Sequence, residues 1–229
     1  MVTLVNVRVQ LKDVFKDVNI NDSGAVCYVT KAGTPDKAAL LDLTGATLTN
    51  PIALTSGLIQ FQYDSSVTAK VDLYIQTAKG HFGVFLNVSP SGPNEINIDT
   101  ARKRGVMKMP FSIADYAANT ETANGFKFPA SSMILDRLHG CGILVTTLEA
   151  SKTVSCGLLS SESGGNATGF INAASTTNAG QVIGTNGALF SSNAPATSDA
   201  QTASDISLTI SSGAVAAKGF ILLPYVLNG

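Results

Sequence analysis

The sequence predicts an all-β protein made of two β-sandwich domains, of which the C-terminal one is jelly-roll-like. Apolar and polar residues alternate with a period of two in many short stretches, as half-buried strands require. Clusters of Gly, Pro, Asn, Asp and Ser separate these stretches at about the 8–12-residue spacing that is typical of sandwiches. No stretch of about a dozen residues carries a clean apolar stripe of helical period.

In the first half of the chain, this alternation predicts strands at residues 5–11, 25–30 and 59–63. Residues 71–75 and 82–88 predict a β-hairpin. The short connection between them contains Gly80, and a glycine supplies the positive φ that a tight reversal needs.

The character of the chain changes at residues 99–110. This segment holds the one basic cluster of the sequence, which consists of Arg102, Lys103, Arg104 and Lys108. Gly105 and Pro110 are expected to interrupt regular structure here. We therefore interpret the segment as an inter-domain connector, with an N-terminal β-sandwich domain at 1–104 and a C-terminal jelly-roll-like domain at 105–229.

The second half alternates between apolar and hydroxyl-rich stretches. The stretches that predict strands are 132–138, 142–148, 153–159, 170–173, 187–190, 206–210 and 219–227. The polar stretches at 160–168 and 191–204 are predicted to be surface loops, because a jelly roll tolerates long connections between its two sheets.

Composition narrows the classes of partner. Hydrophobic residues make up 45% of the 229 residues, and only 14% are charged, against about 25% in an average domain. A poorly charged, hydroxyl-rich surface suits a protein that stays in contact with other proteins. The net charge of −1 provides no general attraction to nucleic acid or anionic lipid. No apolar run approaches the roughly 18 residues that a membrane span needs, so we expect neither a nucleic-acid nor a membrane partner.

The cysteines and the N-terminus indicate where the protein matures. Cys27, Cys141 and Cys156 are an odd number and lie in apolar stretches, which predicts buried free thiols in a reducing cytosol. The first residues show no charged segment followed by an apolar one, so no signal peptide is expected.

Candidate catalytic groups are few. His81 and His139 are each expected to be loop or partly buried histidines, since neither has a second His or Cys at metal-ligand spacing. Cys141 lies two residues from His139 on one face of a predicted strand. Side chains so placed point in parallel and seldom share a productive hydrogen bond, which argues against a Cys–His nucleophile.

The other candidate sites have even less support in the sequence. Asp136, Glu149 and Glu162 would suit a glycosidase pair, but nothing in the sequence pairs them. Residues 161–169 have the composition of a cation-binding turn with one carboxylate, where calcium prefers several. The glycines of 180–187 lack the spacing and the lysine of a phosphate loop. We therefore expect no catalytic residues, no metal and no cofactor.

The basic cluster allows three interpretations. Arg102, Lys103, Arg104 and Lys108 can contact phosphates, form a solvated connector, or meet an acidic protein partner. A run without interleaved aromatic residues in a neutral chain is weak support for nucleic-acid binding. We select these four residues as the candidate partner-binding site.

Two segments resemble modules of virion structural proteins of tailed bacteriophages. Residues 40–82 (LLDLTGATLTNPIALTSGLIQFQY…VDLYIQTAKGHF) resemble an N-terminal β module of these proteins. Residues 132–174 (SMILDRLHGCGILVTTLEASKTVSCGLLSSESGGNATGFINAA), with the terminal GFILLPYVL, resemble their jelly-roll-like modules, which typically read "VGL…GGDADGF". The chain departs from that pattern at Asn166 and Thr168, where acids would be expected, and this weakens the idea of a metal further.

The resemblance implies a non-enzymatic capsid decoration (cement) or head-fibre protein. Such a protein would bind the major capsid protein, form a homotrimer, and sit on the capsid surface of the virion after assembly in the host cytoplasm. The alternative is a phage tail or receptor-/carbohydrate-binding module, which would need a concave aromatic patch. The low aromatic content of 7%, with no tryptophan, counts against it. A hydrolase on a β scaffold would need a carboxylate pair in a cleft.

Overall fold

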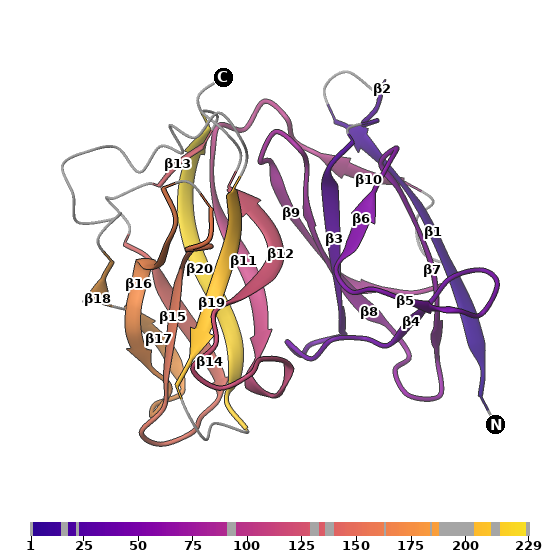
Figure 1. Cartoon of the computed structure of the whole chain (residues 1–229). Coiled ribbons are helices and arrows are strands. Elements are labelled where there is room, and N and C mark those ends of the chain that lie inside the picture. The colour runs from indigo at the N-terminus through magenta and orange to yellow at the C-terminus, as the bar shows by residue number, and fades with distance from the viewer. Residues whose placement is uncertain are drawn as a thin grey trace. The chain divides into compact units, whose positions relative to one another are not determined.

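The chain folds into two units built from strands (Figure 1). The structure is a computed structural model, and it describes residues 2–14, 18–21, 23–90, 95–128, 133–135, 140–162, 164–183, 185–187, 204–211 and 216–227. In these ranges the one helical element is the 3-10 turn η1 (Ile113–Asp115). The predicted all-β class with sandwich-like sheets is therefore confirmed. The units are Met1–Arg102 and Lys103–Gly229, whereas the sequence placed the boundary after residue 104.

The N-terminal unit contains two sheets. The first has the spatial order β10 (Glu95–Ile98), β1 (Leu4–Asp13), β7 (Leu58–Asp64), β4 (Leu40–Leu41) and β5 (Thr47–Leu48), with β2 (Val18–Asn19) also paired to β1. The second has the order β6 (Ile52–Leu54), β3 (Ala25–Lys31), β8 (Val71–Gln76) and β9 (Phe82–Val88). These pairs are antiparallel, except that β1 and β10 run parallel.

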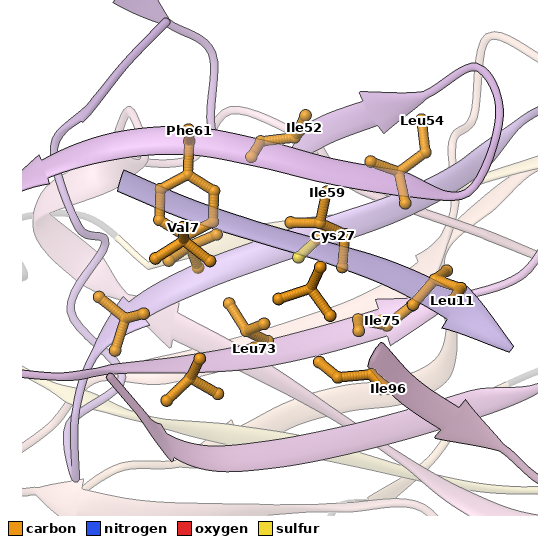
Figure 2. Packing of buried hydrophobic residues seen from close by; sticks show 14 of the residues in the cluster. Val7, Leu11, Cys27, Ile52, Leu54, Ile59, Phe61, Leu73, Ile75 and Ile96 are labelled. Carbon is orange, nitrogen blue, oxygen red and sulfur yellow. The ribbon is translucent and has the colours of Figure 1, made fainter. Parts of the chain in front are cut away.

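The core of this unit lies between the two sheets. Alternate residues of β1 and β7, such as Val7 and Phe61, point toward alternate residues of β3 and β8, such as Cys27 and Leu73 (Figure 2). These four side chains are almost fully buried. The period-two pattern of the sequence thus selects the inward face of each strand.

The strands predicted for this unit are confirmed. β8 and β9 form the expected hairpin, with Gly80 at a φ of +88° in its turn. The sequence did not predict β10, whose four residues pair in parallel with the end of β1.

The C-terminal unit also contains two sheets. One has the order β11 (Arg104–Ser112), β20 (Lys218–Leu227), β14 (Gly142–Thr147) and β17 (Gly180–Ile183), with β13 (Met133–Leu135) also paired to β20. The other has the order β12 (Thr122–Phe128), β19 (Ser204–Ile210), β15 (Thr153–Leu158), β16 (Asn166–Ser175) and β18 (Thr185–Asn186).

The pairings of this unit are nested. β11 pairs with β20, which ends the described chain, and the next strand inward, β12, pairs with β19. β14 pairs with β17, and β15 with β16, all antiparallel. The unit is therefore a long antiparallel hairpin whose two arms fold over into two sheets. Both ends of the unit meet at β11 and β20.

One predicted loop is shorter than expected. Residues 160–168 were assigned to a loop, but β16 begins at Asn166. The close approach of β15 to β16 is possible because Gly157 has no side chain. A Cβ there would lie 1.9 Å from the Asn166 carbonyl oxygen. Residues 191–203 of the second predicted loop and most of the predicted strand at 187–190 lie outside the described residues, and Ser204 begins β19.

Glu121 ties three parts of the second sheet together. Its carboxylate accepts hydrogen bonds from the Ser160 backbone N–H at 2.9 Å, from the Ser160 hydroxyl, and from the Ser207 hydroxyl at 2.6 Å. Burial favours a higher pKa for Glu121, but the hydroxyl bonds from Ser160 and Ser207 and the Ser160 N–H bond together lower it. The charged carboxylate therefore stabilises the fold.

Replacing Glu121 with Gln is expected to lower the free energy of unfolding by about 1–2 kcal/mol at pH 7, since bonds to a charged acceptor are lost. Because the folded pKa of Glu121 lies below the ordinary value of 4.5, this contribution is present above that value. It disappears as the pH falls through the folded pKa. Urea unfolding of both proteins from pH 7 to pH 3 measures the difference.

The matched control is Glu95→Gln, which breaks the Lys12–Glu95 ion pair at 2.9 Å, whose side chains are 21% and 51% exposed. An exposed pair is worth little, so we expect a change below about 0.5 kcal/mol. The assigned role would be contradicted if Glu121→Gln lowered the free energy of unfolding no more than the control does. It would also be contradicted if this loss grew toward low pH.

Candidate partner-binding strand

The predicted basic connector is in large part a strand. β11 runs from Arg104 to Ser112 straight through Gly105 and Pro110, which the sequence interpretation treated as breaks. That expectation was wrong for two physical reasons. β11 is the edge strand of its sheet, where a proline is tolerated. Gly105 gives room to Tyr225, because a Cβ on it would lie 2.8 Å from the Tyr225 hydroxyl oxygen.

The first half of the strand, residues 104–108, has one buried face and one open face, whereas Met109–Ser112 are buried on both faces. Met107 and Met109 are 0% exposed and point into the core of the unit. The residues that alternate with them, Arg104, Val106 and Lys108, lie on the opposite face. Val106 is 51% exposed there, which is unusual for a β-branched side chain in a strand of nine residues. Two of the four predicted partner-binding residues are thus brought to one face with an apolar residue between them.

The neighbouring strand extends this face. Phe220 and Leu222 of β20 lie opposite Pro110 and Lys108 respectively. The Lys108 ammonium stands 4.1 Å from the centroid of the Phe220 ring, a cation–π contact that fixes the lysine stem over the sheet. We call the outward side chains that are at least partly exposed the basic face: Arg104, Val106, Lys108, Lys218, Leu222 and Val226, with the buried Phe220 ring, which is 6% exposed, beneath Lys108. It combines three cations with apolar side chains and contains no carboxylate.

The other two predicted residues lie just before the strand. Arg102 ends the N-terminal unit, and its backbone N–H donates to the Asp99 carboxylate at 3.0 Å. Lys103 begins the C-terminal unit, and its carbonyl oxygen accepts the Leu227 N–H at 2.7 Å. Both side chains are exposed.

Polar side chains of the suggested cation-binding turn form hydrogen bonds within the chain. The Glu162 carboxylate accepts the backbone N–H of Asp205 at 2.7 Å. The Asn166 side-chain oxygen accepts both the N–H and the hydroxyl of Thr168, at 3.1 and 3.2 Å. In the described part of the chain no group of three or more His, Cys, Asp or Glu side chains is placed to hold a metal ion.

The carboxylates considered for a glycosidase are not brought together as a described pair. Glu149 accepts the backbone N–H groups of Ala216 and Ala217 at 2.8 and 3.0 Å, so it fixes the chain before β20. Asp136 lies outside the described residues. Glu162 accepts the Asp205 backbone N–H.

His81 connects three segments of the N-terminal unit. Its Nε2 lies 2.8 Å from the Thr100 carbonyl oxygen, so Nε2 carries a proton and donates. Its Nδ1 lies 3.4 Å from the Thr77 hydroxyl in the β8–β9 turn. The Thr100 hydroxyl in turn donates to the buried carboxylate of Asp13. The ring therefore links the hairpin turn to the residues that lead into the connector. His139 lies outside the described residues.

A shallow groove of about 340 Å³ lies along β9. Residues 84–89 and Ile96 line it, and most of these side chains are apolar. Sites for small molecules combine such walls with several polar groups that fix the ligand, and the polar residues in this lining are Asn87 and Ser89. We assign no ligand to it.

The described helical content includes no segment long and apolar enough to cross a membrane. Comparison with known proteins adds no identity: no protein-family model, no curated protein and no solved structure matches the chain.

The three cysteines are buried and free of disulfides. Burial raises the pKa of Cys141 to about 12 and raises those of Cys27 and Cys156 well above the ordinary thiol value. Only the thiolate is a strong nucleophile, so these thiols are poor candidates for chemistry.

We expect the native protein to react with almost none of an aromatic disulfide reagent at pH 8, and to expose three reactive thiols in denaturant. Absorbance of the released thiolate measures both values. A single fast-reacting thiol in the native protein would contradict this expectation, and alanine replacement of each cysteine in turn would identify it.

Proposed function

We propose that the chain is a non-enzymatic structural protein of a tailed-bacteriophage virion that binds the major capsid protein and stabilises the head as a decoration (cement) protein. The observation that carries the proposal is the nested strand order of the C-terminal unit. The sequence resemblance of residues 40–82 and 132–174 to virion modules supports the same function.

The nested order is the one expected of a jelly roll. In that fold an antiparallel hairpin rolls up so that its outermost strands pair with each other and each next pair alternates between two sheets. β11–β20 and β14–β17 fall in one sheet, and β12–β19 and β15–β16 in the other. Jelly rolls are frequent in viral capsid proteins and lectins. Since one fold hosts many functions, the order favours a class of protein and the surface must supply the rest.

The basic face supplies a surface suited to protein contact. Apolar side chains such as Val106 and Leu222 offer area to bury, while Arg104 and Lys108 offer charges that orient an acidic partner. Interfaces of this kind stabilise a lattice when each subunit bridges neighbouring capsid proteins.

A homotrimer would multiply this effect. When one copy is bound, the other two are held near their sites at high effective concentration, so weak single contacts add up to durable attachment. Assembly in the host cytoplasm also agrees with three buried, reduced cysteines.

We expect light scattering of the purified protein to give three times the mass of the 23.6 kDa chain. It should co-sediment with capsids assembled from the major capsid protein alone and raise the temperature at which they open. The bound fraction should fall as salt rises, because charges orient the contact.

A monomer that fails to sediment with capsids at low salt would overturn this function. Binding to tails or to a glycan array, with no binding to capsids, would establish the alternative of a tail or receptor-/carbohydrate-binding module.

A further inference from the structure

We propose that the free edge of β11 at residues 104–108 binds an extended acidic segment of its partner, which adds to the sheet as a further strand. The inference names the contact and its chemistry for the capsid binding proposed above, and it rests on that proposed function.

The backbone direction is fixed at both ends of the strand. The Lys103 carbonyl oxygen accepts the Leu227 N–H at 2.7 Å, and the Ile113 N–H donates to the Ala217 carbonyl oxygen at 3.0 Å. In an antiparallel pair, residues alternate between those that bond to the partner and those whose N–H and C=O point away from it. Odd-numbered residues of β11 therefore bond to β20, and even-numbered residues point outward.

The two prolines of the pair agree with this assignment. Pro110 and Pro224 have no N–H, and each lies at a position where none is needed between β11 and β20. The N–H and C=O groups of Arg104, Val106 and Lys108 are thus directed at the free edge. Within the part of the chain that the structure describes, no hydrogen bond is made to them.

These same three residues place their side chains on the basic face. A strand added at this edge would put its own side chains directly opposite Arg104, Val106 and Lys108, within the distance at which cross-strand pairs interact. The best complement is an acidic residue, an apolar residue and an acidic residue at alternate positions. One short segment would then pair with both the outward backbone groups and the outward side chains of the β11 edge.

A second copy of the chain fits this edge poorly. Two β11 edges paired antiparallel around Val106 would set Arg104 of each copy against Lys108 of the other. Like charges directly opposite each other destabilise a strand pair. The charges also repel basic strands and leave apolar strands without a counter-charge, so they select an acidic occupant.

The first test uses a defined probe and the whole chain. The probe is the peptide acetyl-Thr-Glu-Thr-Val-Thr-Glu-Thr-amide, titrated at low salt while the backbone amide signals of Arg104, Val106 and Lys108 are followed by NMR. We expect these amides to shift with saturation and to be protected from hydrogen exchange. A peptide with Lys in place of Glu should bind at least about tenfold more weakly, because it opposes like charges.

Two further reagents separate strand addition from simple charge attraction. A peptide N-methylated at its Val loses the donor that faces Val106, and Val106→Pro removes the outward donor of the chain while leaving the bonds to β20 intact. We expect each to reduce binding at least about tenfold, since each removes a ladder hydrogen bond. The inference is overturned if the N-methylated peptide and the Val106→Pro protein each bind as tightly as the unmodified peptide and protein do. It is also overturned if the acidic and basic peptides bind with the same affinity. The peptide reagent decides the question even if Val106→Pro fails to fold.

The second test returns to capsids. Arg104→Glu with Lys108→Glu should abolish co-sedimentation, and Lys79→Glu, an exposed charge in the β8–β9 turn, should leave it unchanged. Wild-type binding that survives the double reversal overturns the edge contact but keeps the proposed function. Absence of wild-type binding overturns the proposed function, while the peptide titration still reports on the edge.

Discussion

The pairing of β11 with β20 is the constraint on which the C-terminal unit depends. It joins the beginning of the unit to its end across nine residue pairs. Because every pair lies far apart in sequence, its formation closes the whole nested hairpin. The register also decides which side chains are buried. A slip of one residue would turn Met107 and Met109 to solvent and bury Arg104 and Lys108.

The same register determines what the edge presents. The outward backbone groups and the outward side chains belong to the same residues, Arg104, Val106 and Lys108, because both alternate with period two along the strand. An edge usually carries charge or proline to discourage random pairing, and β11 carries both. Here Arg104 and Lys108 are both positive and flank the exposed Val106. The same charges that discourage pairing with most strands therefore favour pairing with an acidic one.

The sequence predicted the strands of the N-terminal unit well because alternate residues of each strand point into the core between the two sheets. Alternation in 59–63 and in 71–75 reflects a core between two sheets, and no other arrangement hides those side chains. The sequence did not predict which polar side chains bond to the strand backbone where a neighbouring strand is absent. The Asn50 side chain bonds to both the N–H and the carbonyl of Val29, at 3.0 and 2.6 Å, in the manner of a neighbouring strand. Nothing local to Asn50 reveals a partner 21 residues away.

Other polar positions show the same limit. Asp72 is 2% exposed, and its carboxylate accepts the Gly33 N–H at 2.8 Å and the Asn87 N–H at 2.7 Å. From sequence, an aspartate inside Val71–Gln76 reads as a residue on a solvated face. Its burial depends on the turn at Gly33 and on the irregular end of β9 at Asn87, and the local pattern can place neither. The basic cluster was predicted as a group of sequence neighbours, but the sequence could not show that only Arg104 and Lys108 of the four lie in β11 on one strand face.

The error at Gly105 and Pro110 explains why the candidate site was incomplete. Both residues oppose strand formation when judged alone. In the folded unit Pro110 lies where an N–H toward β20 is unnecessary, and Gly105 makes space for the ring of Tyr225. The tertiary position of each residue removes its unfavourable effect on strand formation. The local sequence pattern carries no information about that position. Val106 therefore looked like an apolar residue in a connector, whereas in the strand it becomes the centre of a free edge. A site built from backbone direction becomes visible only when the register of the strand is known.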